Sequence, residues 1–92
     1  MVRHIDGKAV YERVISRIRE LNVRYGHGYI NAKTLSESIT GKVDMIYNMR
    51  ETGSVPKPQQ YKENLAENLD VNFDWLFYEK HIFMDEVGLT NK

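Results

Sequence analysis

Apolar residues recur at intervals of three or four along most of this chain, which is the spacing of one face of an α-helix. Near the N-terminus this spacing appears in Val10, Val14, Ile18 and Leu21. It predicts a helix from Lys8 to about Val23, with the side chain of Asp6 as its N-cap. The segment 24–29 contains two glycines and breaks the period, so it is predicted to be a loop.

Two short amphipathic segments then meet at Thr40-Gly41 with almost no linker between them. The apolar positions are Leu35 and Ile39 in the first segment and Ile46 and Met49 in the second. They predict one helix from Ala32 to about Thr40, capped by Asn31, and another from about Lys42 to Glu51. Two helices joined by a short turn that contains glycine are typical of a helix-turn-helix.

The remaining pattern predicts two more helices. Pro58 fits the first turn of a fourth helix, in which Tyr61, Leu65 and Leu69 share one side. After a break at residues 70–72, the spacing of Phe73, Leu76 and Phe77 predicts a short fifth helix. Weak alternation at His81–Val87 leaves room for a short C-terminal strand or extension. We therefore expect an all-α, compact five-helix domain, with a core at about 8–78 and an extension at 79–92.

Composition limits the classes of protein that fit. A chain of 92 residues has room for one domain, and the absence of cysteine excludes disulfides and thiolate metal sites. No apolar run approaches the roughly 18 residues that span a bilayer, and the N-terminus lacks a secretory signal. These features predict a cytoplasmic protein without a membrane partner.

Net charge is zero, but the charges are unevenly distributed along the chain. Residues 1–50 hold nine Lys/Arg and five Asp/Glu, whereas residues 51–92 hold four Lys/Arg and eight Asp/Glu. This asymmetry favours a basic face on the half that contains the paired helices, although small domains also segregate a few charges by chance.

The sequence gives little support for catalysis or for metal binding. The three histidines, His4, His27 and His81, are far apart, and the serines have no neighbouring histidine that could act as a base. Gly26-x-Gly28 is too short for a phosphate-binding fingerprint. We expect no enzymatic activity, no metal and no cofactor.

Several of these residues together resemble the Cro and lambda-repressor-like (XRE-type) helix-turn-helix family, over about residues 9–78. The features that carry the resemblance are Leu35-Ser36 with Ile39, Ile46 with Met49, Gly53, Pro56, Leu65-Ala66, Leu69-Asp70-Val71 and Trp75-Leu76. The C-terminal half is the more specific match, although Gly53 comes one residue late. The chain departs from the family pattern in the turn, where the glycine comes one residue late, at Gly41. It also has Lys42 in place of the usual capping serine, and Arg50 in place of a glutamate.

The resemblance implies that the second helix of the motif lies in the major groove of double-stranded DNA. The residues it places against base edges are Lys42, Val43, Asp44, Tyr47 and Asn48. The start of the preceding helix, with Asn31, Lys33 and Thr34, would contact the DNA backbone. A solvated helix face is the alternative explanation for the same polar residues.

The aromatic residues near the C-terminus admit two interpretations. Trp75 and Leu76 are expected to close the core, yet the apolar content of this segment exceeds what one short helix can bury. We therefore expect a homodimer interface that includes Trp75, Phe77, Tyr78, Ile82 and Phe83.

Two hypotheses about function follow. The first is a sequence-specific DNA-binding transcription regulator of the phage or mobile-element repressor type. The second is a protein-interaction module, such as an antirepressor or adaptor, that keeps the fold and uses its aromatic C-terminal surface. Zero net charge and the displaced glycine favour the second, whereas the charge asymmetry and the polar helix face favour the first.

Overall fold

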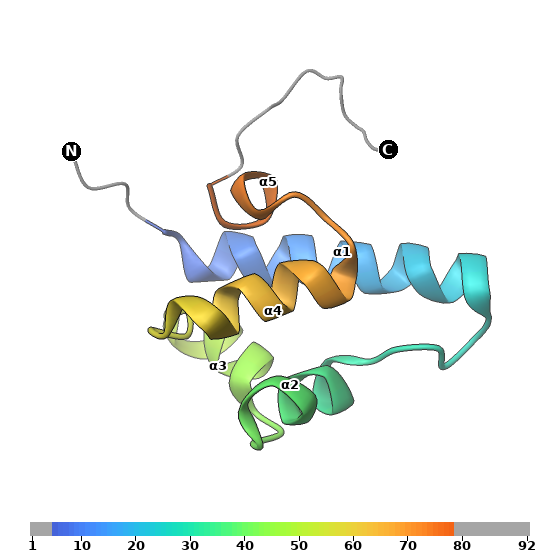
Figure 1. Cartoon of the computed structure of the whole chain (residues 1–92), viewed down its shortest axis with the longest axis horizontal. Helices are drawn as coiled ribbons and strands as arrows, with labels where there is room; N and C mark the ends of the chain where they lie inside the picture. Colours follow the sequence, from blue (N-terminus) through green and yellow to red (C-terminus); the bar gives the residue numbers. More distant parts are fainter. Residues whose placement is uncertain (1–4, 79–92) are drawn as a thin grey trace.

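The computed structural model describes residues 5–78, and this part of the chain is a bundle of five helices (Figure 1). They are α1 (Gly7–Tyr25), α2 (Ala32–Thr40), α3 (Met45–Thr52), α4 (Gln59–Leu69) and α5 (Phe73–Tyr78). No strand occurs between residues 5 and 78, so the predicted all-α, five-helix fold is confirmed. The strand considered at His81–Val87 lies outside the described residues.

A side-chain cap sets the start of the long helix α1, and a glycine sets its end. The Asp6 carboxylate accepts hydrogen bonds from the backbone N–H groups of Lys8, at 3.1 Å, and Ala9, at 3.4 Å, which confirms the predicted N-cap. At the other end Gly26, with φ 120°, leaves helical geometry while its N–H still donates to the Asn22 carbonyl. The helix therefore extends one residue further at the start and two further at the end than predicted.

Gly7 permits the close approach of α1 to the end of α3. Its N–H donates to the Gly53 carbonyl at 3.1 Å, and a Cβ at Gly7 would overlap that same carbonyl group. Only glycine fits a backbone contact this close. The start of the first helix is thereby fixed against the C-terminus of the third.

The core forms where α1 packs against α3, α4 and α5, and where α2 packs against α3 and α4. Its buried apolar side chains are Val10, Val14, Ile18, Leu21, Ala32, Leu35, Met45, Ile46, Met49, Leu65, Ala66, Leu69, Leu76 and Phe77. Nearly all of the apolar positions predicted from helical spacing are in this set. Ile39, Tyr61 and Phe73 are partly buried at its edge.

Two arginines of α1 hold the C-terminal ends of other helices. Arg17 Nε donates to the Leu69 carbonyl at 2.8 Å and its Nη2 donates to the Asp70 carbonyl at 3.3 Å, at the end of α4. Arg13, one turn earlier, donates from Nε to the Leu76 carbonyl in α5 at 2.8 Å. A cation at the carbonyl end of a helix satisfies unpaired acceptors and opposes the negative end of the helix dipole.

The predicted break between the last two helices is present. Asp70 ends α4 in the left-handed region, with φ 56°, and the Asn72 side chain accepts from the Trp75 N–H to start α5. One boundary needs a small correction, because α4 begins at Gln59 and Pro58 is its N-cap rather than its first helical residue.

Candidate nucleic-acid interface

The N-terminus of α2 is capped as the sequence predicts. The Asn31 side-chain oxygen accepts from the Thr34 N–H at 2.9 Å, and the Thr34 hydroxyl donates back to the Asn31 carbonyl at 3.3 Å. Asn31, Lys33 and Thr34 are all exposed. The three residues predicted to contact the DNA backbone therefore share one solvent-facing helix end, and the oxygens of two of them take part in the cap.

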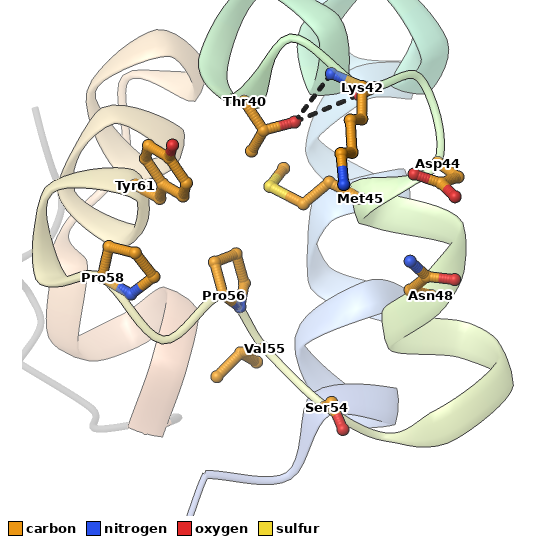
Figure 2. A pocket seen from close by; sticks show the side chains of 10 residues that line it. All are labelled: Thr40, Lys42, Asp44, Met45, Asn48, Ser54, Val55, Pro56, Pro58 and Tyr61. Carbon is orange, nitrogen blue, oxygen red and sulfur yellow. Dashed lines mark hydrogen bonds between the residues drawn. The ribbon is translucent and has the colours of Figure 1, made fainter.

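The connection 41–44 between α2 and α3 is built around the displaced glycine. Gly41 ends α2 in the left-handed region, with φ 82°, and its N–H donates to the Glu37 carbonyl at 2.8 Å. The Thr40 hydroxyl accepts from the Lys42 N–H at 3.1 Å and lies 3.2 Å from the Lys42 carbonyl (Figure 2). It also lies 3.0 Å from the Ser36 carbonyl, and its one proton can be donated to either oxygen. A glycine one position later than in the family pattern thus still makes a tight turn.

The predicted start of the second motif helix is wrong by three residues. α3 begins at Met45, so Lys42, Val43 and Asp44 lie in the turn that precedes it. The physical reason is the turn itself, because the left-handed Gly41 and the Thr40–Lys42 hydrogen bonds hold the chain outside helical geometry. Asp44, at the N-cap position, makes no side-chain capping hydrogen bond.

A residue of α2 supplies the capping hydroxyl that α3 lacks. Ser36 is fully buried, donates to the Ala32 carbonyl at 2.7 Å and accepts from the Ile46 N–H at 3.1 Å. The hydroxyl therefore satisfies a buried donor in the first turn of the neighbouring helix. Sequence reasoning assigned Ser36 no such role. The one available indication was a serine three residues before Ile39, on the apolar side of the predicted helix.

The turn before α3 and the face of α3 that points away from the core together carry the residues predicted to contact bases. Met45, Ile46 and Met49 are buried, and the five predicted residues on the turn and helix are exposed: Lys42, Val43, Asp44, Tyr47 and Asn48. Two of them are large and apolar, since Val43 is 41% exposed and Tyr47 is 39% exposed. The structure thus gathers all five around the start of one helix and leaves them accessible.

Three of these residues line a cavity of about 270 Å³ between α3 and the start of α4 (Figure 2). Lys42, Asp44 and Asn48 form its α3 side, and Pro56, Pro58 and Tyr61 lie opposite them. Val43 and Tyr47 do not line it. Among residues 5–78, none makes a hydrogen bond to the side-chain amide of Asn48, so that amide is available to a ligand.

Arg50 lies beside this face in a cluster that the sequence did not predict. Its guanidinium lies 5.3 Å from the Tyr47 ring centroid and 5.9 Å from that of Tyr11 in α1. It also forms a 2.7 Å ion pair with Glu51, and the hydrogen bond and charge of that carboxylate raise the pKa of Arg50. Arg50 therefore positions the Tyr47 ring at the edge of the exposed face, with its own charge balanced locally.

The predicted dimer interface requires a correction at Phe77. This side chain is 1% exposed and packs inside the subunit, with its ring centroid 4.9 Å from that of Phe73. A residue already buried in its own core offers no surface to a partner. Trp75 and Tyr78 are partly buried, and Ile82 and Phe83 lie outside the described residues.

No group of three or more His, Cys, Asp or Glu residues between residues 5 and 78 is arranged to hold a metal ion. None of the described helices is both long and apolar enough to cross a bilayer.

Comparison with known proteins gives no match, because no family model, curated protein or solved structure is significantly similar to this chain. The features that indicate a function are therefore the helices α2 and α3 and the side chains exposed around them.

Proposed function

We propose that this protein binds double-stranded DNA in a sequence-specific manner and regulates transcription, as a regulator of the Cro and lambda-repressor-like type. One observation carries the proposal. The connection 41–44 and the first turn of α3 expose five residues together, namely Lys42, Val43, Asp44, Tyr47 and Asn48. Met45, Ile46 and Met49 on the same segment are buried. A helix supported in this way can enter the major groove without loss of its own packing.

The exposed side chains have the chemistry that base recognition needs. An asparagine such as Asn48 can pair with adenine through two hydrogen bonds, and a carboxylate such as Asp44 can accept from the amino group of cytosine. Val43 offers an apolar contact to the methyl group of thymine. Because the side-chain amide of Asn48 makes no hydrogen bond within residues 5–78, binding a base would break no existing contact of that amide.

The N-terminus of α2 supports the same orientation on DNA. Helix N-termini favour anions because of unpaired N–H groups and the helix dipole, and Lys33 adds a full positive charge there. Contacts to phosphate fix the position of a protein on a duplex without selecting its sequence. In this proposal the start of α2 fixes the position of the protein on the duplex, and the start of α3 selects the base sequence.

The proposal is tested by gel-shift titration of the full chain against random genomic duplex fragments at low and moderate salt. Asn48→Ala should weaken binding to the preferred fragments by about 1–3 kcal/mol and relax the preference at one base pair. Asn68→Ala is the matched control, because Asn68 is an exposed asparagine at the far end of α4. A wild-type chain that binds no fragment at low salt would contradict the proposal.

A second candidate function is that of a protein-interaction module, and the cavity beside α3 is the observation that favours it. Its α4 side is largely apolar, with Val55, Pro56, Pro58 and Tyr61, and the net charge of the chain is zero. Apolar surface of this kind suits a peptide better than a phosphate backbone. Loss of partner binding after Tyr61→Ser, in a chain that does not bind DNA, would favour this candidate.

A further inference from the structure

We propose that the segment Val23–Tyr29, which comprises the end of α1 and the start of the loop to α2, is a second contact surface for DNA. In this arrangement the hydroxyls of Tyr25 and Tyr29 and the guanidinium of Arg24 donate hydrogen bonds to phosphates beside the base pairs contacted by α3. This inference rests on the proposed function, because it assumes that α2 and α3 bind the duplex.

Exposed apolar side chains gather at two places in the described part of the chain. One is the start of α3, with Val43 and Tyr47, and the other is this segment, where Val23 is 88% exposed, Tyr25 57% and Tyr29 58%. Figure 1 shows the end of α1 extending beyond the other helices, with the chain then returning to α2. Exposure of this extent shows that the two tyrosines do not pack on the core.

The segment is held in one conformation by its own hydrogen bonds. The Asn22 side-chain amide donates to the Ile30 carbonyl at 3.0 Å and accepts from the Ile30 N–H at 2.9 Å, which ties the two ends together. Inside the segment the Tyr29 N–H donates to the Gly26 carbonyl at 3.0 Å. The two tyrosine rings pack with their centroids 4.8 Å apart. Side chains ordered before binding lose less entropy when a ligand arrives.

Charge identifies the ligand as a polyanion. No acidic residue occurs between Glu20 and Glu37, a stretch that contains Arg24, His27 and Lys33. Glu20 itself is paired with Arg17 at 3.1 Å. Arg24 lies in the last turn of α1, 6.0 Å from the Tyr25 ring centroid, so cation and hydroxyls occupy the same patch. Arginine and tyrosine are both common phosphate donors in protein–DNA complexes.

The segment also directly precedes, along the chain, the end of α2 that the proposed function assigns to the DNA backbone. Ile30 and Asn31 connect the tied loop directly to the cap of α2. A duplex that lies along the start of α2 would extend past Lys33 toward Arg24. The segment would then lengthen the contact without adding any base recognition.

The experiment uses the full chain and two duplexes that carry the same selected sequence, one short and one extended by about one helical turn, or about 10 bp, on each side. The wild type should bind the extended duplex about tenfold more tightly, which is the effect of one or two net hydrogen bonds. The double variant Tyr25→Phe/Tyr29→Phe, which removes only the hydroxyls, should lose most of that advantage. Arg24→Gln should lower the slope of log affinity against log salt by about one.

Arg19→Gln is the matched control, because Arg19 is an exposed arginine of α1 on another side of the helix. Thermal unfolding of each variant checks that the exposed substitutions leave the fold intact. The inference would be overturned if the wild type bound the two duplexes equally, or if the loop variants behaved like Arg19→Gln. If Asn48→Ala still weakened binding in that case, the proposed function would stand without this inference.

Two other results would also overturn it. If Tyr25→Phe/Tyr29→Phe keeps the full advantage and Tyr25→Ala/Tyr29→Ala loses it, the rings make the contact and phosphate donation is wrong. If Asn48→Ala and the loop variants all leave binding unchanged, the proposed function fails and this inference fails with it.

Discussion

Two arginines of α1, Arg13 and Arg17, and two lysines of the α2–α3 unit, Lys33 and Lys42, serve different purposes. Arg13 and Arg17 donate to backbone carbonyls at the ends of α5 and α4, so much of their hydrogen-bonding capacity is used inside the fold. Lys33 and Lys42 are exposed, and no described residue accepts a hydrogen bond from either ammonium group. The first pair stabilises the bundle, whereas the second is available to an anionic ligand.

This difference shows why charge counted along the sequence is a poor measure of charge on a surface. Residues 1–50 carry a formal excess of four positive charges. Two of the arginines responsible are turned toward helix ends, and Arg50 is paired with Glu51. The basic surface that remains is local, at the starts of α2 and α3 and at the end of α1.

The largest expected effect comes from replacing one of the two arginines that donate to helix ends. Arg17 is 14% exposed, and Arg17→Met would keep its apolar stem but leave the carbonyls of Leu69 and Asp70 without their partner. Hydrogen bonds to charged groups contribute about 1.5–3 kcal/mol, and we expect a loss of stability in that range. Urea unfolding measures it, and Arg19→Met is the control on the exposed side. A loss below about 0.5 kcal/mol, typical of a surface site, would show that Arg17 is not structural.

The next effect lies inside the α2–α3 unit, where Ser36 of α2 caps α3. Ser36→Ala removes the hydroxyl that accepts from the buried Ile46 N–H, and an unsatisfied buried donor costs about 1–3 kcal/mol. Ser38→Ala is a control on the same helix, because the Ser38 hydroxyl donates only to a carbonyl of its own helix. Equal stability of the two variants, measured by thermal unfolding, would contradict the capping role of Ser36.

A smaller effect of opposite sign is expected at the end of α4. Asp70 adopts φ 56°, a left-handed conformation that glycine adopts without steric cost. Asp70→Gly should therefore raise the free energy of unfolding by up to about 1 kcal/mol. Arg17 binds the backbone carbonyl at this position and should keep its contact. Destabilisation in urea would show that the Asp70 side chain contributes more than its backbone conformation costs.

The smallest effect on stability is expected when the exposed lysines of the α2–α3 unit are replaced. Lys33→Gln and Lys42→Gln should change the free energy of unfolding by less than about 0.5 kcal/mol, because both side chains are exposed. If they contact phosphate, each should lower the salt slope of DNA binding by about one. A change in stability comparable to that of Arg17→Met would remove the distinction between the two groups of cations.

Helical spacing predicted the elements and most of the core, because period and burial are linked by simple geometry. The caps Asp6 and Asn31 and the break at residues 70–72 also followed from local side-chain chemistry. Contacts between distant segments could not be obtained this way. Arg17 with Leu69 and Ser36 with Ile46 depend on how helices meet in space, which the period of one helix does not specify.

The candidate site was predicted in part for the same reason. The exposed set on the turn and α3 follows from the face opposite Ile46 and Met49, and the structure gathers it as expected. The start of α3 was misplaced because the turn depends on Gly41 and Thr40 acting together. Phe77 was assigned to an interface because sequence alone does not show how much apolar surface five small helices can bury.

The central claim is that the starts of α2 and α3 bind DNA, and chemical-shift mapping of the backbone amides tests it most directly. Titration of the full, isotope-labelled chain with a duplex from the preferred genomic fragments should perturb the amides of residues 31–34 and 42–48 first. Amides of α5, such as Leu76 and Phe77, should change little. Perturbations confined to α5 and the cavity side of α4, or none at all at low salt, would contradict the account.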